Sequence, residues 1–112
     1  MLKLKQSDVD STLWLSFEGR DVRVVNVKDG SKYYVACDIQ DNILGVSNIS
    51  KLLEHVDHRC KAEAVITFVE DFNAQRYNLV DLDGLRWIIF RARKCEVDRL
   101  AFVKWVESKD VL

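Results

Sequence analysis

Apolar residues alternate with polar ones near the start of the chain, a pattern that is typical of strands burying one face. The alternation runs from Leu13 to Phe17 and ends in a turn at Glu18-Gly19-Arg20. The β-branched segment from Val22 to Val27 then predicts a second strand. Its apolar phase shifts between Val24 and Val25, which predicts either a bulge or a strand buried on both faces.

A hairpin follows this second strand. Asp29-Gly30 is a typical two-residue hairpin turn, whose two central positions favour positive φ. Lys32 to Ala36 would then pair back on the preceding strand. The segment from Leu13 to Ala36 is therefore predicted to form a three-stranded antiparallel meander.

The helical periodicity begins where the meander ends, within the stretch from Tyr33 to Val56. Ala36, Ile39 and Ile43 fall on one helix face, and Gly45 fits the left-handed residue that ends a helix. Ser47 or Asn48 is expected to cap the next helix. Its stripe of apolar positions has the spacing i, i+3, i+4, i+7: Ile49, Leu52, Leu53 and Val56.

The second half of the chain predicts another hairpin and another helical pair. Ala64 to Val69 and Arg76 to Val80 have strand composition and flank a polar loop. Asp81 or Asp83 is expected to cap the following helix. The last helix is predicted at about Glu96 to Glu107, with a wide apolar arc made of Val97, Leu100, Ala101, Val103 and Trp105.

These elements predict an α+β fold, with a small antiparallel meander and a second β-hairpin covered by two helical pairs. A chain of 112 residues fits one domain, over 1–112. Residues 1–12 could form a loose N-terminal arm of this domain.

Composition excludes some classes of function and leaves others open. The net charge is −1, so the chain lacks the strong basic excess of many nucleic-acid-binding proteins, although local basic patches remain. The three cysteines form no CxxC pair, and no apolar run approaches the length of a membrane span. We expect an intracellular protein without a cofactor and without membrane partners.

Catalytic and metal sites have weak support in the sequence. His55, Asp57, His58 and Cys60 are close in sequence and could ligate zinc, but no second cluster completes the site. Cys37 with His55 could form a nucleophile–base pair, but no third orienting group is evident. Paired carboxylates such as Asp38 and Asp41 are better explained as helix-start residues. The chain is therefore not expected to be an enzyme.

Several short motifs, in order, resemble the BRO amino-terminal (Bro-N) family of baculovirus BRO proteins and phage antirepressors. The similarity covers about Leu15 to Leu112. The matching residues are Phe17-Glu18-Gly19, Val22-Arg23-Val24-Val25, Gly30, Tyr34-Val35-Ala36, Asp38-Ile39, Leu44-Gly45, Asn48, Ser50-Lys51, His55-Val56-Asp57, Gly84-Leu85, Arg91-Ala92-Arg93-Lys94, Phe102-Val103-Lys104-Trp105-Val106 and Val111-Leu112. The chain departs from the family at Val46, where an aromatic residue is usual, and at Ala92 and near Cys95, where serine and proline are usual.

The resemblance implies an α+β domain, with DNA binding in some members and regulation of viral or host transcription. It also implies a location in the host cytoplasm, or in the nucleus if the virus is eukaryotic. Binding through the helical pair around Gly45 would place Asn48, Ser50 and Lys51 at the DNA, with His55 as a further candidate. The apolar register, however, does not fit a standard helix-turn-helix. The alternative is a helical pair that only covers the meander. The full set of candidate DNA-binding residues is Asn48, Ser50, Lys51, Arg59, Lys61, Arg86, Arg91, Arg93 and Lys94.

The segment from Arg86 to Lys94 carries four positive charges and no negative one. It could contact phosphates, which would position the protein without reading sequence. The alternative is a solvated helix end, where cations complement the helix dipole.

A different class of function is a protein-interaction module that engages a repressor or a host regulator without DNA, as antirepressors do. The near-zero net charge favours it. Tryptophans are mostly core residues, so an exposed Trp14 or Phe72 would indicate a protein interface. The partner is thus either double-stranded DNA or a regulatory protein, and homo-oligomerisation is left open.

Overall fold

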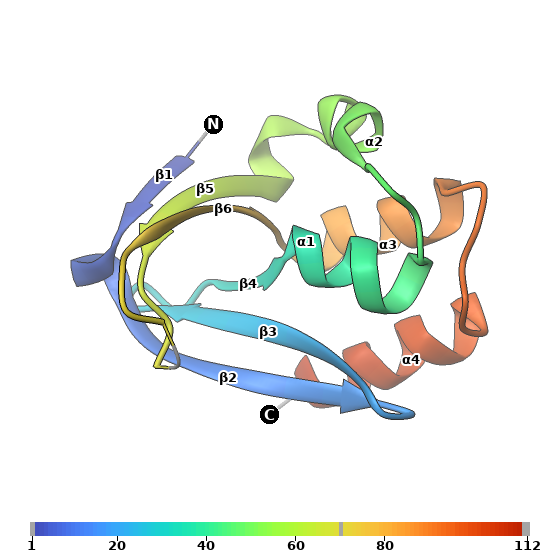
Figure 1. Ribbon diagram of the computed structural model, residues 1–112, viewed down its shortest axis with the longest axis horizontal. Helices are drawn as coiled ribbons and strands as arrows, with labels where there is room; N and C mark the ends of the chain where they lie inside the picture. Colours follow the sequence, from blue (N-terminus) through green and yellow to red (C-terminus); the bar gives the residue numbers. More distant parts are fainter. Residues whose placement is uncertain (1, 70, 111–112) are drawn as a thin grey trace.

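Six strands form one curved sheet in the order β1-β5-β6-β4-β3-β2 (Figure 1). The computed structural model describes residues 2–69 and 71–110. The strands are β1 (Leu2–Lys5), β2 (Val9–Phe17), β3 (Arg20–Val27), β4 (Lys32–Val35), β5 (Lys61–Ile66) and β6 (Gln75–Val80). All neighbouring strands are antiparallel except β1 and β5, so the α+β prediction is confirmed.

The helices gather on one side of this sheet (Figure 1). The α-helices are α1 (Ala36–Asp38), α2 (Ser50–His55), α3 (Leu82–Arg91) and α4 (Arg99–Asp110). A π-helical segment, η2 (Ile39–Leu44), continues α1, and two 3₁₀ turns complete the set, η1 (Gln6–Asp8) and η3 (His58–Cys60). No helix in the described part of the chain is long and apolar enough to cross a membrane.

The predicted meander is present as β2, β3 and β4. Its first turn is tight: Phe17 pairs with Arg20, and both turn residues have positive φ, 52° at Glu18 and 80° at Gly19. The Asp29-Gly30 turn differs from the prediction, because only Gly30 has a positive φ. The loop is longer, with Asn26 opposite Lys32 and a hydrogen bond of 2.9 Å from Gly30 N to Val27 O.

The phase shift in β3 reflects burial on both faces rather than a bulge. Val22 and Val24 belong to the core under the helices. Val25 belongs to a second core on the other face, with residues of β1, β4, β5 and β6. The irregularity in the β2–β3 pairing lies instead between Val9 and Ser11.

The N-terminal residues are not a loose arm. β1 pairs in parallel with β5, with Leu4 opposite Ala64, and Leu4 is buried. Val9 already belongs to β2. The prediction failed because a parallel pair joins segments far apart in the sequence, and a four-residue strand carries little local signal.

The second hairpin joins the meander through a short contact. β5 and β6 pair along their length, from Lys61–Val80 to Ile66–Gln75. β6 then meets β4 at Tyr34–Val80 and Val35–Leu79. β5 thus begins before the predicted Ala64 and ends before Val69.

The helix boundaries follow polar caps. Gly45 ends η2 with φ 69°, as predicted. The predicted cap of α2 at Ser47 or Asn48 is wrong, because the residue at that position is Ile49 and no side chain caps the helix. Asn48 Oδ1 instead accepts a hydrogen bond of 2.7 Å from Ser50 N in the turn before α2. Asp81 caps α3 by accepting from Gly84 N at 2.9 Å. Asp98 accepts from Ala101 N at 2.9 Å, so α4 begins later than the predicted Glu96.

The buried face of α4 differs from the predicted arc. Phe102, Val103 and Val106 are buried, whereas Leu100 is 54% exposed and Ala101 is also exposed. Phe102 contacts Phe17 edge-to-face, with ring centroids 5.3 Å apart.

Candidate nucleic-acid interface

A groove of about 420 Å³ lies between α2, the loop before it and the end of α3. It brings together residues that are more than thirty positions apart in the sequence. Its apolar lining is supplied by Val46, Leu52 and Ala92. Its polar and charged lining consists of Asn48, Lys51, His55, Arg91 and Arg93.

The groove is basic on its rim. Lys51, Arg91 and Arg93 are exposed, and the described residues that line the groove include no acidic side chain. Four of the nine predicted DNA-binding residues therefore share one surface: Asn48, Lys51, Arg91 and Arg93. His55 belongs to it as well.

The Trp87 ring of α3 contacts two side chains of the groove, Arg91 and His55. The guanidinium of Arg91 lies over the Trp87 ring, 5.4 Å from its centroid. The His55 ring lies 6.5 Å from the Trp87 ring, centroid to centroid, which ties α2 to α3. A guanidinium stacked on an aromatic face retains donors that can bind an anion.

Arg99 satisfies the last carbonyls of α3. Its Nη1 donates to Ile89 O at 2.9 Å and to Ala92 O at 2.7 Å. Cations at a helix C-terminus usually complement the dipole, and that was the alternative explanation for the basic segment before it. Arg91 lies in the last turn of α3, where its charge also complements the dipole, and both Arg91 and Arg93 line the groove.

Lys94 does not line the groove. Its Nζ donates to Gly45 O at 3.1 Å and lies 3.5 Å from Glu96 Oε2. Glu96 also accepts from Arg20 at 3.0 Å, and this hydrogen bond, with the positive charge of Lys94, lowers the pKa of Glu96. Lys94 therefore holds the segment after α3 against Gly45.

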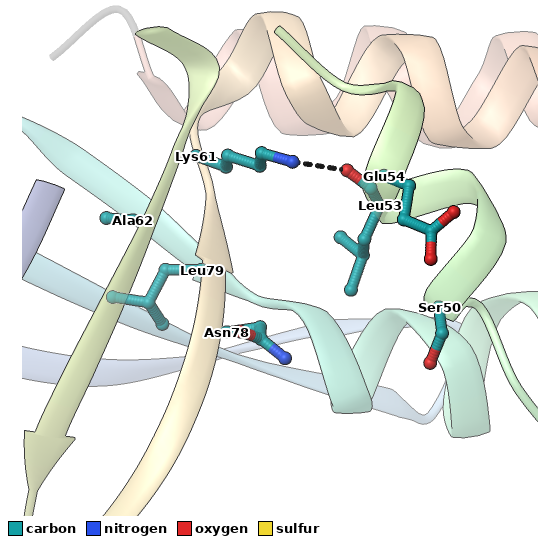
Figure 2. A pocket seen from close by; sticks show the side chains of 7 residues that line it. All are labelled: Ser50, Leu53, Glu54, Lys61, Ala62, Asn78 and Leu79. Carbon is teal, nitrogen blue, oxygen red and sulfur yellow. Dashed lines mark hydrogen bonds between the residues drawn. The ribbon is translucent and has the colours of Figure 1, made fainter. Parts of the chain in front are cut away.

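Ser50 and Lys61 lie on another side of α2. They line a separate pocket of about 230 Å³ between α2 and the β5–β6 hairpin (Figure 2). Lys61 Nζ donates to Leu53 O at 2.7 Å, across this pocket (Figure 2). These two residues were predicted at the DNA, but they are not on the groove.

Arg59 and Arg86 are also outside the groove, and both form ion pairs. Arg59 Nη2 lies 3.0 Å from Asp57 Oδ2, and this hydrogen-bonded pair lowers the pKa of Asp57 to about 2. Arg86 lies 2.7 Å from Asp83 and 3.4 Å from Glu107, between α3 and α4. The nine predicted DNA-binding residues therefore do not form one surface. Only those in and before α2 and at the end of α3 lie together, along the groove.

The helical pair is not a standard helix-turn-helix. α2 has six residues, and the segment from Gly45 to Ile49 separates it from η2. A typical motif has a shorter turn and a longer recognition helix. Deep reading of a major groove by α2 is therefore not supported, whereas contact with a backbone does not require a long helix.

The other candidate sites of the sequence do not assemble. Cys37 and His55 line different pockets. Burial raises the pKa of the Cys37 thiol, which disfavours the nucleophilic thiolate. Among the described residues, the potential metal ligands that come together are Cys60, Asp81 and Asp83, and Asp81 already caps α3.

The sequence analysis missed a buried ion pair. Arg23 lies in a strand among valines, and its Nε is 2.8 Å from Asp38 Oδ2. Asp38 lies in the first turn of α1, as predicted, but it is 8% exposed and also accepts this guanidinium. An arginine between two buried valines, Val22 and Val24, was the signal that a partner carboxylate should exist.

Comparison with protein-family models, curated proteins and solved structures finds no match for this chain. The resemblance to Bro-N domains therefore stays a prediction.

Proposed function

We propose that this chain is a transcription-regulatory domain of viral or phage type, which binds double-stranded DNA through the groove between α2 and the end of α3. In this proposal Lys51, Arg91 and Arg93 contact phosphates. Asn48 and His55 line the same groove and add hydrogen bonds to the DNA backbone or to an accessible base edge.

The observation that supports the proposal is the convergence of Lys51 with Arg91 and Arg93 on one groove lined by no described acidic residue. In a chain with a net charge of −1, such a local concentration of cations is not an effect of composition. Phosphate contacts usually make up most of the hydrogen bonds in a DNA complex. The Bro-N resemblance agrees with this assignment.

Salt titration of binding to a random-sequence duplex tests the proposal. Counterion release predicts that log K falls linearly with log salt, with a slope of roughly −0.9 for each phosphate neutralised. Three phosphate contacts would give a slope of about −3 on this basis. Absence of any complex at low salt would refute DNA binding by this domain.

The alternative is a protein-interaction module, as in an antirepressor, and one observation favours it. Trp14 is 51% exposed and Phe72 is fully exposed. Aromatic side chains are frequent anchors of protein interfaces. Recovery of a repressor or host regulator on the immobilised chain after nuclease treatment, with loss on Trp14→Ala, would support this function over DNA binding.

A further inference from the structure

The two edges of the sheet differ in how they are protected. β1, at one edge, is four residues long and carries Lys3 and Lys5. Short edge strands with lysines resist pairing with another chain. β2, at the other edge, is nine residues long. From Ser11 to Phe17 it carries no charged residue, and the whole chain has no proline.

The register identifies which backbone groups of β2 face outward. Phe17 and Arg20 flank a two-residue turn, so they form a hydrogen-bonded pair. Hydrogen-bonded pairs alternate along an antiparallel ladder. The backbone groups of Thr12, Trp14 and Ser16 therefore point away from β3, and β2 is the last strand of the described sheet.

Two large apolar side chains of this edge are exposed. Leu13 is 39% exposed and Trp14 is 51% exposed. The Trp14 ring is held by Arg23, whose guanidinium carbon lies 5.4 Å from the ring centroid. A large aromatic side chain fixed before binding loses little conformational entropy on contact.

We propose that the β2 edge pairs antiparallel with β2 of a second copy of this chain, about a two-fold axis at Leu13. Thr12 of one copy then faces Trp14 of the other and exchanges backbone hydrogen bonds with it. Aromatic and β-branched residues are favourable cross-strand partners. Leu13 faces Leu13 of the second copy, at a position where side chains approach closely.

Charge favours a second copy as the occupant. The paired segments from Ser11 to Leu15 are uncharged, so the two-fold places no like charges opposite each other. The β2 edge shares no residue with the basic groove, which lies between α2 and the end of α3, so this inference does not depend on DNA binding.

Sedimentation velocity over a concentration series tests this pairing. The wild-type chain should reach twice the mass of a single chain. Leu13→Lys and Leu13→Glu should each stay at the single-chain mass, because identical charges would face each other. Leu2→Lys places the same charge on β1, at a leucine of similar exposure, and should still dimerise.

An equimolar mixture of Leu13→Lys and Leu13→Glu provides the sharper test. Since residue 13 faces itself across the axis, opposite charges should restore the double mass. The proposal is overturned if the wild-type chain keeps the single-chain mass at all concentrations, if Leu13→Lys still dimerises, or if the mixture stays monomeric. Circular dichroism melts of each variant confirm that the fold is retained.

Discussion

The carboxylate of Asp38 accepts three hydrogen bonds from Arg23. Its Oδ2 accepts from Arg23 N at 2.9 Å and from Arg23 Nε at 2.8 Å, and its Oδ1 accepts from Arg23 Nη2 at 3.0 Å. The guanidinium also lies over the rings of Phe68 and Tyr77, 4.7 and 5.0 Å from their centroids. The ion pair thus joins β3 to α1, and the same guanidinium contacts the second hairpin. The hydrogen bonds to Asp38 raise the pKa of Arg23.

Removing one partner of this pair should be costly. Asp38→Ala leaves the Arg23 charge partly buried without a counter-charge, and we expect a loss of about 3–5 kcal/mol in unfolding free energy. Urea denaturation measures it. Arg59→Ala removes the cation of the exposed pair with Asp57 and should leave the midpoint nearly unchanged, because Asp57 keeps its hydrogen bond from the backbone N of residue 59. Equal effects of the two substitutions would contradict the structural role of Asp38.

Gly45 should tolerate a side chain less well than Gly19. Both have positive φ, so alanine is strained at either position, by roughly 1–2 kcal/mol. A Cβ at Gly45 would also collide with the Glu96 carboxylate, whereas nothing lies within 4 Å of one at Gly19. Gly45→Ala should therefore destabilise the protein more than Gly19→Ala in thermal or urea unfolding. The reverse order would contradict this packing.

The Glu96 contacts predict a pH dependence. Its hydrogen bond from Arg20 and the charge of Lys94 lower the folded-state pKa below the ordinary value of 4.5. Folding therefore favours the ionised form, and its contribution is present above that ordinary value and is lost as pH falls through the folded pKa. The stability difference between wild type and Glu96→Gln should shrink from pH 6 to pH 3. A difference that is independent of pH would contradict it.

Lys51 should contribute one phosphate contact. Lys51→Ala is expected to weaken duplex binding about equally for unrelated sequences, and to reduce the magnitude of the salt slope by about 1. Lys61→Ala is the matched control, since Lys61 lies on the separate pocket beneath α2. If both variants lowered the slope alike, the contact surface would extend beyond the groove.

Local signals predicted much of the fold. Alternation and turn residues located the meander, and Gly45 and Asp81 marked helix ends because their roles depend on their immediate neighbours. β1 and the junction of β4 with β6 were missed, since pairing between distant segments leaves no local pattern. The later start of α4 depended on Asp98, which competes with Glu96 as a helix-start residue.

The sequence could predict which basic residues were candidates for the site, but not which of them lie together on one surface. Sequence identified Lys51 and Arg91 as basic candidates, and the packing of α2 beside α3 brings them together. It could not show that Lys61 donates to Leu53 O or that Arg86 pairs with Glu107, because those partners come from other elements. Nor could it assign Arg99 to the carbonyls of α3.

The central claim is that the groove, and not the overall surface, binds DNA. Fluorescence anisotropy of a labelled random duplex at low salt should be measured for wild type, Arg91→Glu/Arg93→Glu and Arg59→Glu. The account predicts that the double variant loses binding, while Arg59→Glu, an exposed arginine outside the groove, retains it. Unchanged binding by Arg91→Glu/Arg93→Glu would contradict the account.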